Sequence, residues 1–203
     1  MTDVAELREL FTAEAERDRP DRARPDVGII MGSDSDLDVM AGASETLEEL
    51  GFEELTDYDD PPAVEYTYES WVVSAHRTPD LMYAYAETAA DRGLDVILAG
   101  AGGKSADLPN MTASIAYPVP VIGIPVQEKS VDSVLGMPSG APITAVDAGK
   151  SENAALSAVQ ILARSDETLR ARLLERHETQ SADVAAVSKS LHEQGTAAFR
   201  DST

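Results

Sequence analysis

The chain has 203 residues, which is long enough for one α/β domain with a substantial core and short for two. It contains no cysteine, so disulfides, thiolate nucleophiles and cysteine-ligated zinc are excluded, and its three histidines lie far apart in sequence. The net charge of −21 repels nucleic acid and suits a surface solvated in concentrated salt. Because no run approaches the roughly 20 apolar residues of a membrane span and the acidic first residues do not resemble a signal peptide, we expect a cytoplasmic protein with no membrane or nucleic-acid partner.

Residues 1–25 are expected to form an appended segment. Apolar residues recur at helical spacing between Asp3 and Arg17, which predicts an amphipathic helix there. The following run, DRPDRARPD, contains two prolines and is interpreted as a linker. We therefore expect an α/β domain at residues 26–164 and a helical tail at residues 165–203.

The central part of the chain alternates between short apolar runs and helical patterns. Apolar runs predict strands at residues 27–31, 66–74, 95–100, 120–126 and 141–149. Helices are predicted at residues 37–50, from the N-cap Thr78 to Gly93, and at 153–163, whereas the acidic residues 52–65 are expected to form a surface excursion. This alternation predicts a parallel sheet with right-handed crossovers.

Polar and glycine-rich segments follow the predicted strands, at the edge where such sheets bind ligands. They read GSDSD (32–36), SAHRTP (74–79), AGAGGKS (99–105), PVQEKS (125–130) and MPSG (137–140). Glycine, serine and charged residues thus concentrate at the carboxyl ends of the strands. The sequence therefore predicts a binding site at that edge.

The first two of these segments contain candidate site residues. Ser33 and neighbouring amides could hold a phosphate while Asp36 accepts from a sugar or an amine, although a helix cap at Ser35 or Asp36 is the commoner use of such residues. His76 is a candidate for proton transfer, because imidazole is the side chain best suited to giving and taking a proton at neutral pH, and Arg77 suits an anion. A backbone-bonded loop histidine beside a salt-bridged arginine would explain the same residues.

The remaining motifs are weaker. The glycines of AGAGGKS allow close approach to a flat or anionic ligand, but their spacing is neither that of a P-loop nor that of a dinucleotide fingerprint, and a tight turn would also explain them. Lys104, Lys129 and Lys150 lie in predicted strand-end loops and could offset substrate charge, or could be scattered surface residues. No serine-hydrolase pattern is present.

Taken together, the motifs resemble the PurE family, the carboxyaminoimidazole ribonucleotide mutases of purine synthesis, over roughly residues 26–163. The matching pieces are IIMGSDSD (29–36), VVSAHRTPD (72–80), AGAGG (99–103), LPNM (108–111), PVIGIPVQ (120–127), SVLGMPSGAP (133–142) and AGKSENAALSAVQILA (148–163). AGAGG is the form typical of the mutase branch. The acidic composition resembles that of family members from salt-loving archaea.

The resemblance implies a three-layer αβα flavodoxin-like fold assembled as a homo-octamer. It implies conversion of N5-carboxyaminoimidazole ribonucleotide to 4-carboxy-5-aminoimidazole ribonucleotide through carbon dioxide, with no metal or other cofactor. His76 would be the catalytic acid–base residue. Substrate-binding residues would be Ser33, Asp36, Ser74, Arg77, Gly100, Ala101, Gly102, Gly103 and Leu108.

The sequence departs from the family in the loop after AGAGG. Relatives usually carry a histidine shortly before Leu-Pro, whereas residues 104–107 here read KSAD, and no role is assigned to Asp107. The departure keeps open direct carboxylation of aminoimidazole ribonucleotide on the same fold. A non-catalytic nucleotide-binding module and an acidic scaffold are the alternatives from other functional classes.

Overall fold

The computed structural model describes residues 3–20 and 23–202. Residues 1–2 and 203, at the ends of the expected terminal segments, and residues 21–22, in the expected linker, lie outside the described residues. The chain divides into two compact units, Met1–Val159 and Gln160–Thr203, which are described separately.

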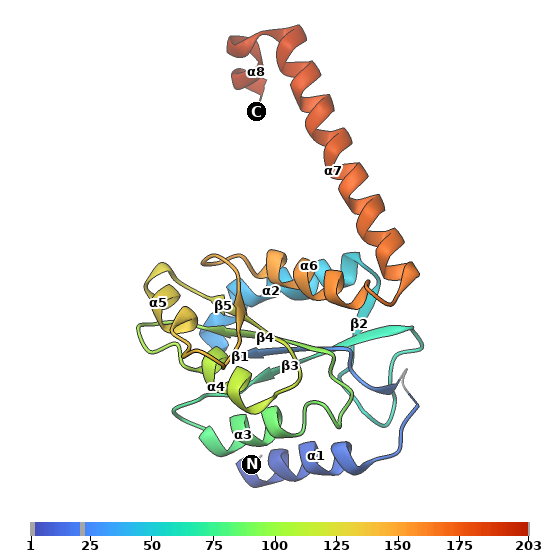
Figure 1. Ribbon diagram of the computed structural model, residues 1–203. Helices are drawn as coiled ribbons and strands as arrows, with labels where there is room; N and C mark the ends of the chain where they lie inside the picture. The colour runs from blue at the N-terminus through green and yellow to red at the C-terminus, as the bar shows by residue number, and fades with distance from the viewer. Residues whose placement is uncertain (1–2, 21–22, 203) are drawn as a thin grey trace. The chain divides into compact units, whose positions relative to one another are not determined.

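The first unit is built on a six-stranded sheet in which every neighbouring pair is parallel (Figure 1). Its order is β2-β3-β1-β4-β5-β6. The strands are β1 (Val27–Met31), β2 (Phe52–Glu54), β3 (Tyr66–Val72), β4 (Val96–Ala101), β5 (Val121–Pro125) and β6 (Thr144–Ala145). Without the edge strand β2, this is the doubly wound order of flavodoxin-like sheets, whose switch point lies between β1 and β4.

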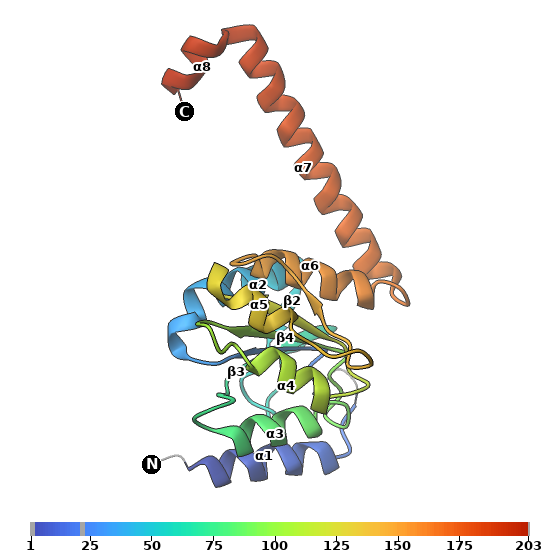
Figure 2. The same ribbon diagram turned by 60° about the vertical axis from the view of Figure 1, so that its left-hand side comes forward.

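Helices cover both faces of this sheet, as Figures 1 and 2 show. On one face lie α2 (Leu37–Glu49) and α6 (Ser151–Leu162). On the other lie α1 (Val4–Glu16), α3 (Pro79–Glu87) and α4 (Leu108–Ile115). Because β1, β4 and β5 are buried along their whole length, their near-continuous apolar sequences match a sheet covered on both sides.

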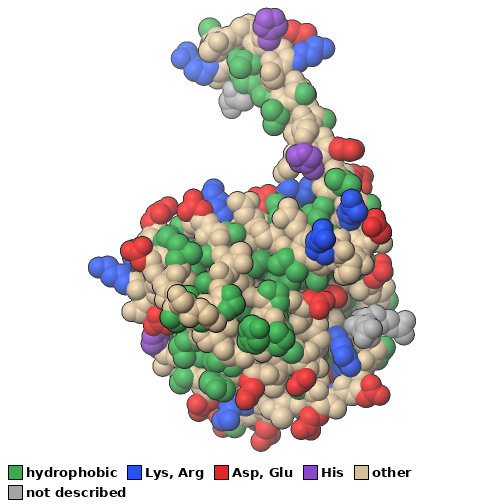
Figure 3. All heavy atoms as spheres, in the orientation of Figure 1, with side chains coloured by type: hydrophobic (Ala, Val, Ile, Leu, Met, Phe, Trp, Pro, Cys, Tyr) green, Lys and Arg blue, Asp and Glu red, His purple; other side chains and the backbone are tan. Residues whose placement is uncertain are grey.

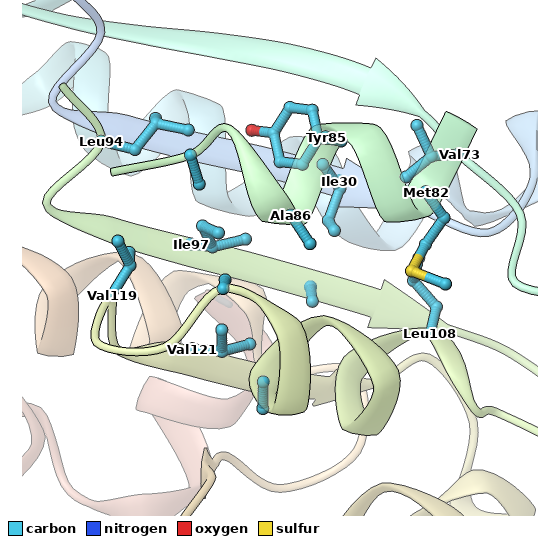
Figure 4. Packing of buried hydrophobic residues seen from close by; sticks show 14 of the residues in the cluster. Ile30, Val73, Met82, Tyr85, Ala86, Leu94, Ile97, Leu108, Val119 and Val121 are labelled. Atoms are coloured by element: carbon cyan, nitrogen blue, oxygen red, sulfur yellow. The ribbon is translucent and has the colours of Figure 1, made fainter. Parts of the chain in front are cut away.

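The core between the sheet and α3 joins residues from distant parts of the chain (Figure 4). Ile30 and Ile97, from the central strands, belong to one buried cluster with Met82 and Tyr85 of α3. Phe11 of α1 joins this cluster and is fully buried, with its ring edge-on to Trp71 and to Tyr85 at centroid distances of 5.0 and 5.3 Å. The N-terminal helix is therefore packed onto the α/β core.

Several elements differ from the sequence predictions. A short strand, β2, lies inside the expected excursion, and the expected strand at 141–149 is reduced to the two residues of β6. Helix α3 ends at Glu87, and turns lead from there to Gly93, which has φ +96°. Two short helices, α4 and α5 (Val131–Leu135), were not expected, because eight and five residues carry too little periodicity to predict them.

The second unit consists mainly of the 28-residue helix α7 (Glu167–Gln194), followed by α8 (Thr196–Ser202). Asp166 is the N-cap of α7, and its Oδ1 accepts from the N–H of Leu169 at 2.9 Å. Within the described ranges, no helix is both long and apolar enough to cross a bilayer.

Candidate active site

A cavity of about 490 Å³ opens at the carboxyl ends of β1, β3, β4 and β5, beside the switch point of the sheet. The expected site residues that line it are Ser33, Asp36, Ser74, His76, Arg77, Ala101, Gly102, Gly103 and Leu108. Gly32, Ser35, Ala75, Ser105, Asp107, Gln127 and Lys129 complete the wall. Segments up to 97 residues apart in sequence, from Gly32 to Lys129, thus meet around one space.

Gly100 is the expected substrate-binding residue that the structure does not place on the cavity wall. It lies inside β4, where an added Cβ would overlap the sulfur of Met40 from α2. The absence of a side chain at residue 100 therefore serves the packing of α2 on the sheet. Its assignment to substrate binding stays a prediction, because the structure places its neighbour Ala101, but not Gly100, on the cavity wall.

The turn after β1 carries a buried carboxylate. A short 3₁₀ turn (Asp34–Asp36) starts at Ser33, whose hydroxyl accepts from the N–H of Ser35 at 3.4 Å. Asp36 follows at the N-cap of α2, but its side chain makes no capping hydrogen bond. The helix-cap alternative for Asp36 is therefore wrong, and the carboxylate instead lines the cavity.

Burial of Asp36 has an electrostatic consequence. The residue is only 6% exposed, and loss of hydration raises the pKa of its carboxyl above the ordinary 3.8. Hydrogen bonding to the backbone of Ser33 and the positive charge of Arg77 act in the opposite direction. An added Cβ on Gly102 would lie 3.1 Å from Asp36 Oδ1, so the glycine turn after β4 leaves the space beside this carboxylate open.

The turn after β3 fixes Arg77 through backbone and side-chain bonds. Thr78 was expected to cap α3, but its hydroxyl instead accepts from the N–H of Ser74 at 2.9 Å. The Ser74 hydroxyl accepts from the N–H of Arg77 at 3.2 Å, and Arg77 Nη2 donates to the carbonyl of Gly32 at 2.7 Å. The guanidinium is thus tied to the turn after β1, on the cavity wall.

His76 occupies the same turn and is 60% exposed at the side chain. Its Nε2 lies 3.0 Å from Oδ2 of Asp107, a residue 31 positions further along the chain. The other carboxylate oxygen of Asp107 accepts from the hydroxyl of Ser133 at 3.3 Å. An imidazole, a guanidinium and glycine turns therefore share one cavity, which suits proton transfer on an anionic ligand.

The cavity wall also includes Asp107, Gln127 and Lys129, which were not among the expected substrate-binding residues. Gln127 and Lys129 lie in a strand-end segment noted for its charge, and Lys129 lines the cavity whereas Lys104 and Lys150 do not. Asp107 had no local signal, because its partner is far away in sequence. Among the described residues, no group of three or more histidines, aspartates or glutamates could hold a metal ion.

Comparisons with known proteins agree with this architecture. The family model described as AIR carboxylase matches residues 26–183. N5-carboxyaminoimidazole ribonucleotide mutase of Mycobacterium tuberculosis is 46% identical over 173 residues, covering 82% of this chain and 90% of the relative. The mutase of Bacillus subtilis is 45% identical over 176 residues, covering 83% and 99%.

Among solved structures, Treponema denticola PurE matches with a TM-score of 0.66 at 24% identity, over 83% of this chain and 99% of that one. This similarity confirms the predicted flavodoxin-like α/β fold. The sequence matches show more than a shared fold, because they extend at above 40% identity over most of both chains. The chain therefore belongs to the AIR carboxylase family.

Proposed function

We propose that the chain is an N5-carboxyaminoimidazole ribonucleotide mutase, which moves a carboxylate from N5 to C4 of the imidazole. The observation that carries this proposal is the shared cavity of His76, Arg77 and the glycine turn at 101–103. Relatives that bear this name, 45–46% identical over most of their length, support it.

The walls of the cavity suggest how a nucleotide would bind. Arg77 and Ser33, from the turns after β3 and β1, would hold the phosphate, since a guanidinium and exposed hydroxyls suit that group. Asp36 would accept from the ribose, and Ser74 keeps Arg77 in place. Ala101, Gly102, Gly103 and Leu108 would surround the base.

His76 would move the proton that the reaction requires. In its protonated form it gives a proton to N5 as the N5-carboxylate leaves as carbon dioxide, which produces aminoimidazole ribonucleotide. C4 then attacks the carbon dioxide held beside the ring, and the neutral imidazole takes the C4 proton. The proton count balances, and trapping the gas makes the second step effectively intramolecular.

Direct carboxylation is the second candidate, because the matching family model is described as AIR carboxylase and residues 104–107 depart from the expected loop. Supplying each substrate separately distinguishes the two. A mutase converts the N5-carboxylated nucleotide in bicarbonate-free buffer. Product formed only from aminoimidazole ribonucleotide with bicarbonate would instead identify a carboxylase.

The resemblance also supports a cytoplasmic homo-octamer adapted to high salt. Light scattering tests the assembly, with a mass near eight times 21.6 kDa as the expected result. A monomer or dimer at assay concentration would contradict it.

A further inference from the structure

We propose that Asp107 is a positioning residue that holds the His76 ring for proton transfer, an inference that rests on the proposed mutase function. The His76 Nε2 to Asp107 Oδ2 distance is 3.0 Å, and both residues line the cavity. His76 is 60% and Asp107 43% exposed at the side chain, so packing alone does not fix the imidazole. A directed hydrogen bond is therefore what gives the ring one orientation.

The position of Asp107 in the fold supports this role. It occupies the N-cap of α4, where an aspartate ordinarily accepts from the backbone N–H groups of the first turn, yet it makes no such bond. The N-cap residues Asp3 and Asp166 do accept them, from Ala5 and Leu169 at 3.4 and 2.9 Å. The Asp107 carboxylate is thus directed away from its own helix and toward the histidine.

A second contact holds the other oxygen of the carboxylate. Ser133 of α5 donates its hydroxyl hydrogen bond to Asp107 Oδ1 at 3.3 Å. The Ser133 carbonyl in turn accepts from Nδ2 of Asn110 in α4 at 2.6 Å. Helices α4 and α5 are therefore linked through Ser133, and this link leaves Oδ2 aimed at His76.

The arrangement suits a histidine that must both give and take a proton. When Nε2–H donates to Asp107, the lone pair of the neutral ring lies on Nδ1, which we assign as the nitrogen that exchanges the proton. Protonation of Nδ1 leaves the hydrogen bond from Nε2–H to Asp107 intact. The ring therefore keeps its orientation through both halves of the reaction.

The test measures kcat and KM with the N5-carboxylated nucleotide for Asp107→Ala, Ser133→Ala and the double variant. We expect Asp107→Ala to lower kcat about 10–100-fold with little change in KM, as for other partners that orient a functional histidine. Ser133→Ala should lower kcat by a smaller factor in the wild-type background and have no further effect once Asp107 is removed. Asp132→Asn, an exposed neighbour with the same charge change, is the matched control and should leave kcat unchanged.

Two results would overturn the inference while leaving the mutase function in place. One is an active wild type whose kcat is unaffected by Asp107→Ala. The other is a loss from Ser133→Ala that is equal in both backgrounds, which would show that the two residues act independently. A wild type that converts none of the N5-carboxylated nucleotide would instead overturn the proposed function. If Asp107→Ala does not fold, Ser133→Ala alone tests the inference, and an unchanged kcat for that variant would contradict it.

Discussion

Asp36 combines a role in the cavity with a cost in stability. Because burial raises its pKa above 3.8 in the folded state, the folded chain holds this proton more tightly than the unfolded chain does. The ionised Asp36 carboxylate therefore destabilises the fold most at pH values above its folded pKa. This destabilisation becomes smaller as the pH falls toward 3.8 and the carboxyl is protonated. Ionised Asp36 destabilises the fold at pH 7, which is tolerable if the carboxylate binds substrate.

We therefore expect Asp36→Asn to unfold at a higher temperature than wild type at pH 7 and to bind nucleotide more weakly. The gain in Tm should shrink as the pH is lowered toward 3.8, where the wild-type carboxyl is protonated. Thermal unfolding at several pH values and calorimetry with aminoimidazole ribonucleotide measure the two effects. Asp38→Asn, at an exposed site in the first turn of α2, is the control, and an equal change in Tm for both variants would contradict this account.

Arg77 gives a prediction about binding. Loss of a charge-assisted bond to a phosphate costs about 2 kcal/mol, or roughly 30-fold in affinity. Arg77→Ala should therefore raise KM by about that factor and change kcat less, because the phosphate does not react. Arg170→Ala, in the second unit, should leave KM unchanged. A KM for Arg77→Ala within twofold of wild type would show that Arg77 does not bind the phosphate.

The residues of the site could be predicted to different extents. His76 and Arg77 were identified from a motif that is contiguous in sequence, and the cavity contains both. Asp107 was not, since its contact spans 31 residues and depends on where the loop after β4 meets the turn after β3. The packing of Gly100 against Met40 could not be predicted, because the motif does not show that Met40 approaches it from α2.

At the scale of elements, a buried ion pair connects β3 to the end of the α3 segment. Arg92 Nη1 lies 2.5 Å from Oε1 of Glu69, and both side chains are 1% exposed. The guanidinium also lies over the rings of Phe11 and Tyr85, at 4.8 and 4.5 Å from their centroids. The pair therefore joins β3, α3 and the N-terminal helix.

Removal of one partner would leave an uncompensated charge in this interior. Glu69→Ala should lower the free energy of unfolding by about 3–5 kcal/mol, measured by denaturant titration. Replacing both partners by apolar residues, as in Glu69→Leu/Arg92→Met, should cost less than the single change. Glu53→Ala, at an exposed site in β2, is the control and should lower the free energy of unfolding only slightly. An equally small loss for Glu69→Ala would show that the buried pair does not stabilise the fold.

The elements that the sequence predicted best are those whose burial is uniform. Strands β1, β4 and β5 were predicted to within one residue at each end because every residue in them is buried and is apolar or glycine. Strand β2 was missed because two of its three residues are exposed glutamates. The α1 helix was predicted from its periodicity, but the burial of Phe11 against Trp71 was not, since it depends on contacts 60 residues away.

At the scale of the whole molecule, the main feature is the net charge of −21. Acidic side chains are visible on the face shown in Figure 3. Mutual repulsion of these carboxylates opposes compaction at low salt, and the Debye length falls from about 10 Å at 0.1 M to about 3 Å at 1 M. We therefore expect both Tm and mutase activity to rise with potassium chloride over this range. An unchanged Tm and a falling activity would show that the acidic surface is not an adaptation to salt.

The most direct test of the account is the turnover of His76→Asn with N5-carboxyaminoimidazole ribonucleotide, measured beside its nucleotide affinity. We predict that turnover falls by at least ~10²-fold, because the proton shuttle is removed, while nucleotide affinity stays within a few-fold of wild type. His177→Asn, on the exposed surface of α7, should keep full turnover. Wild-type turnover by His76→Asn would contradict the account.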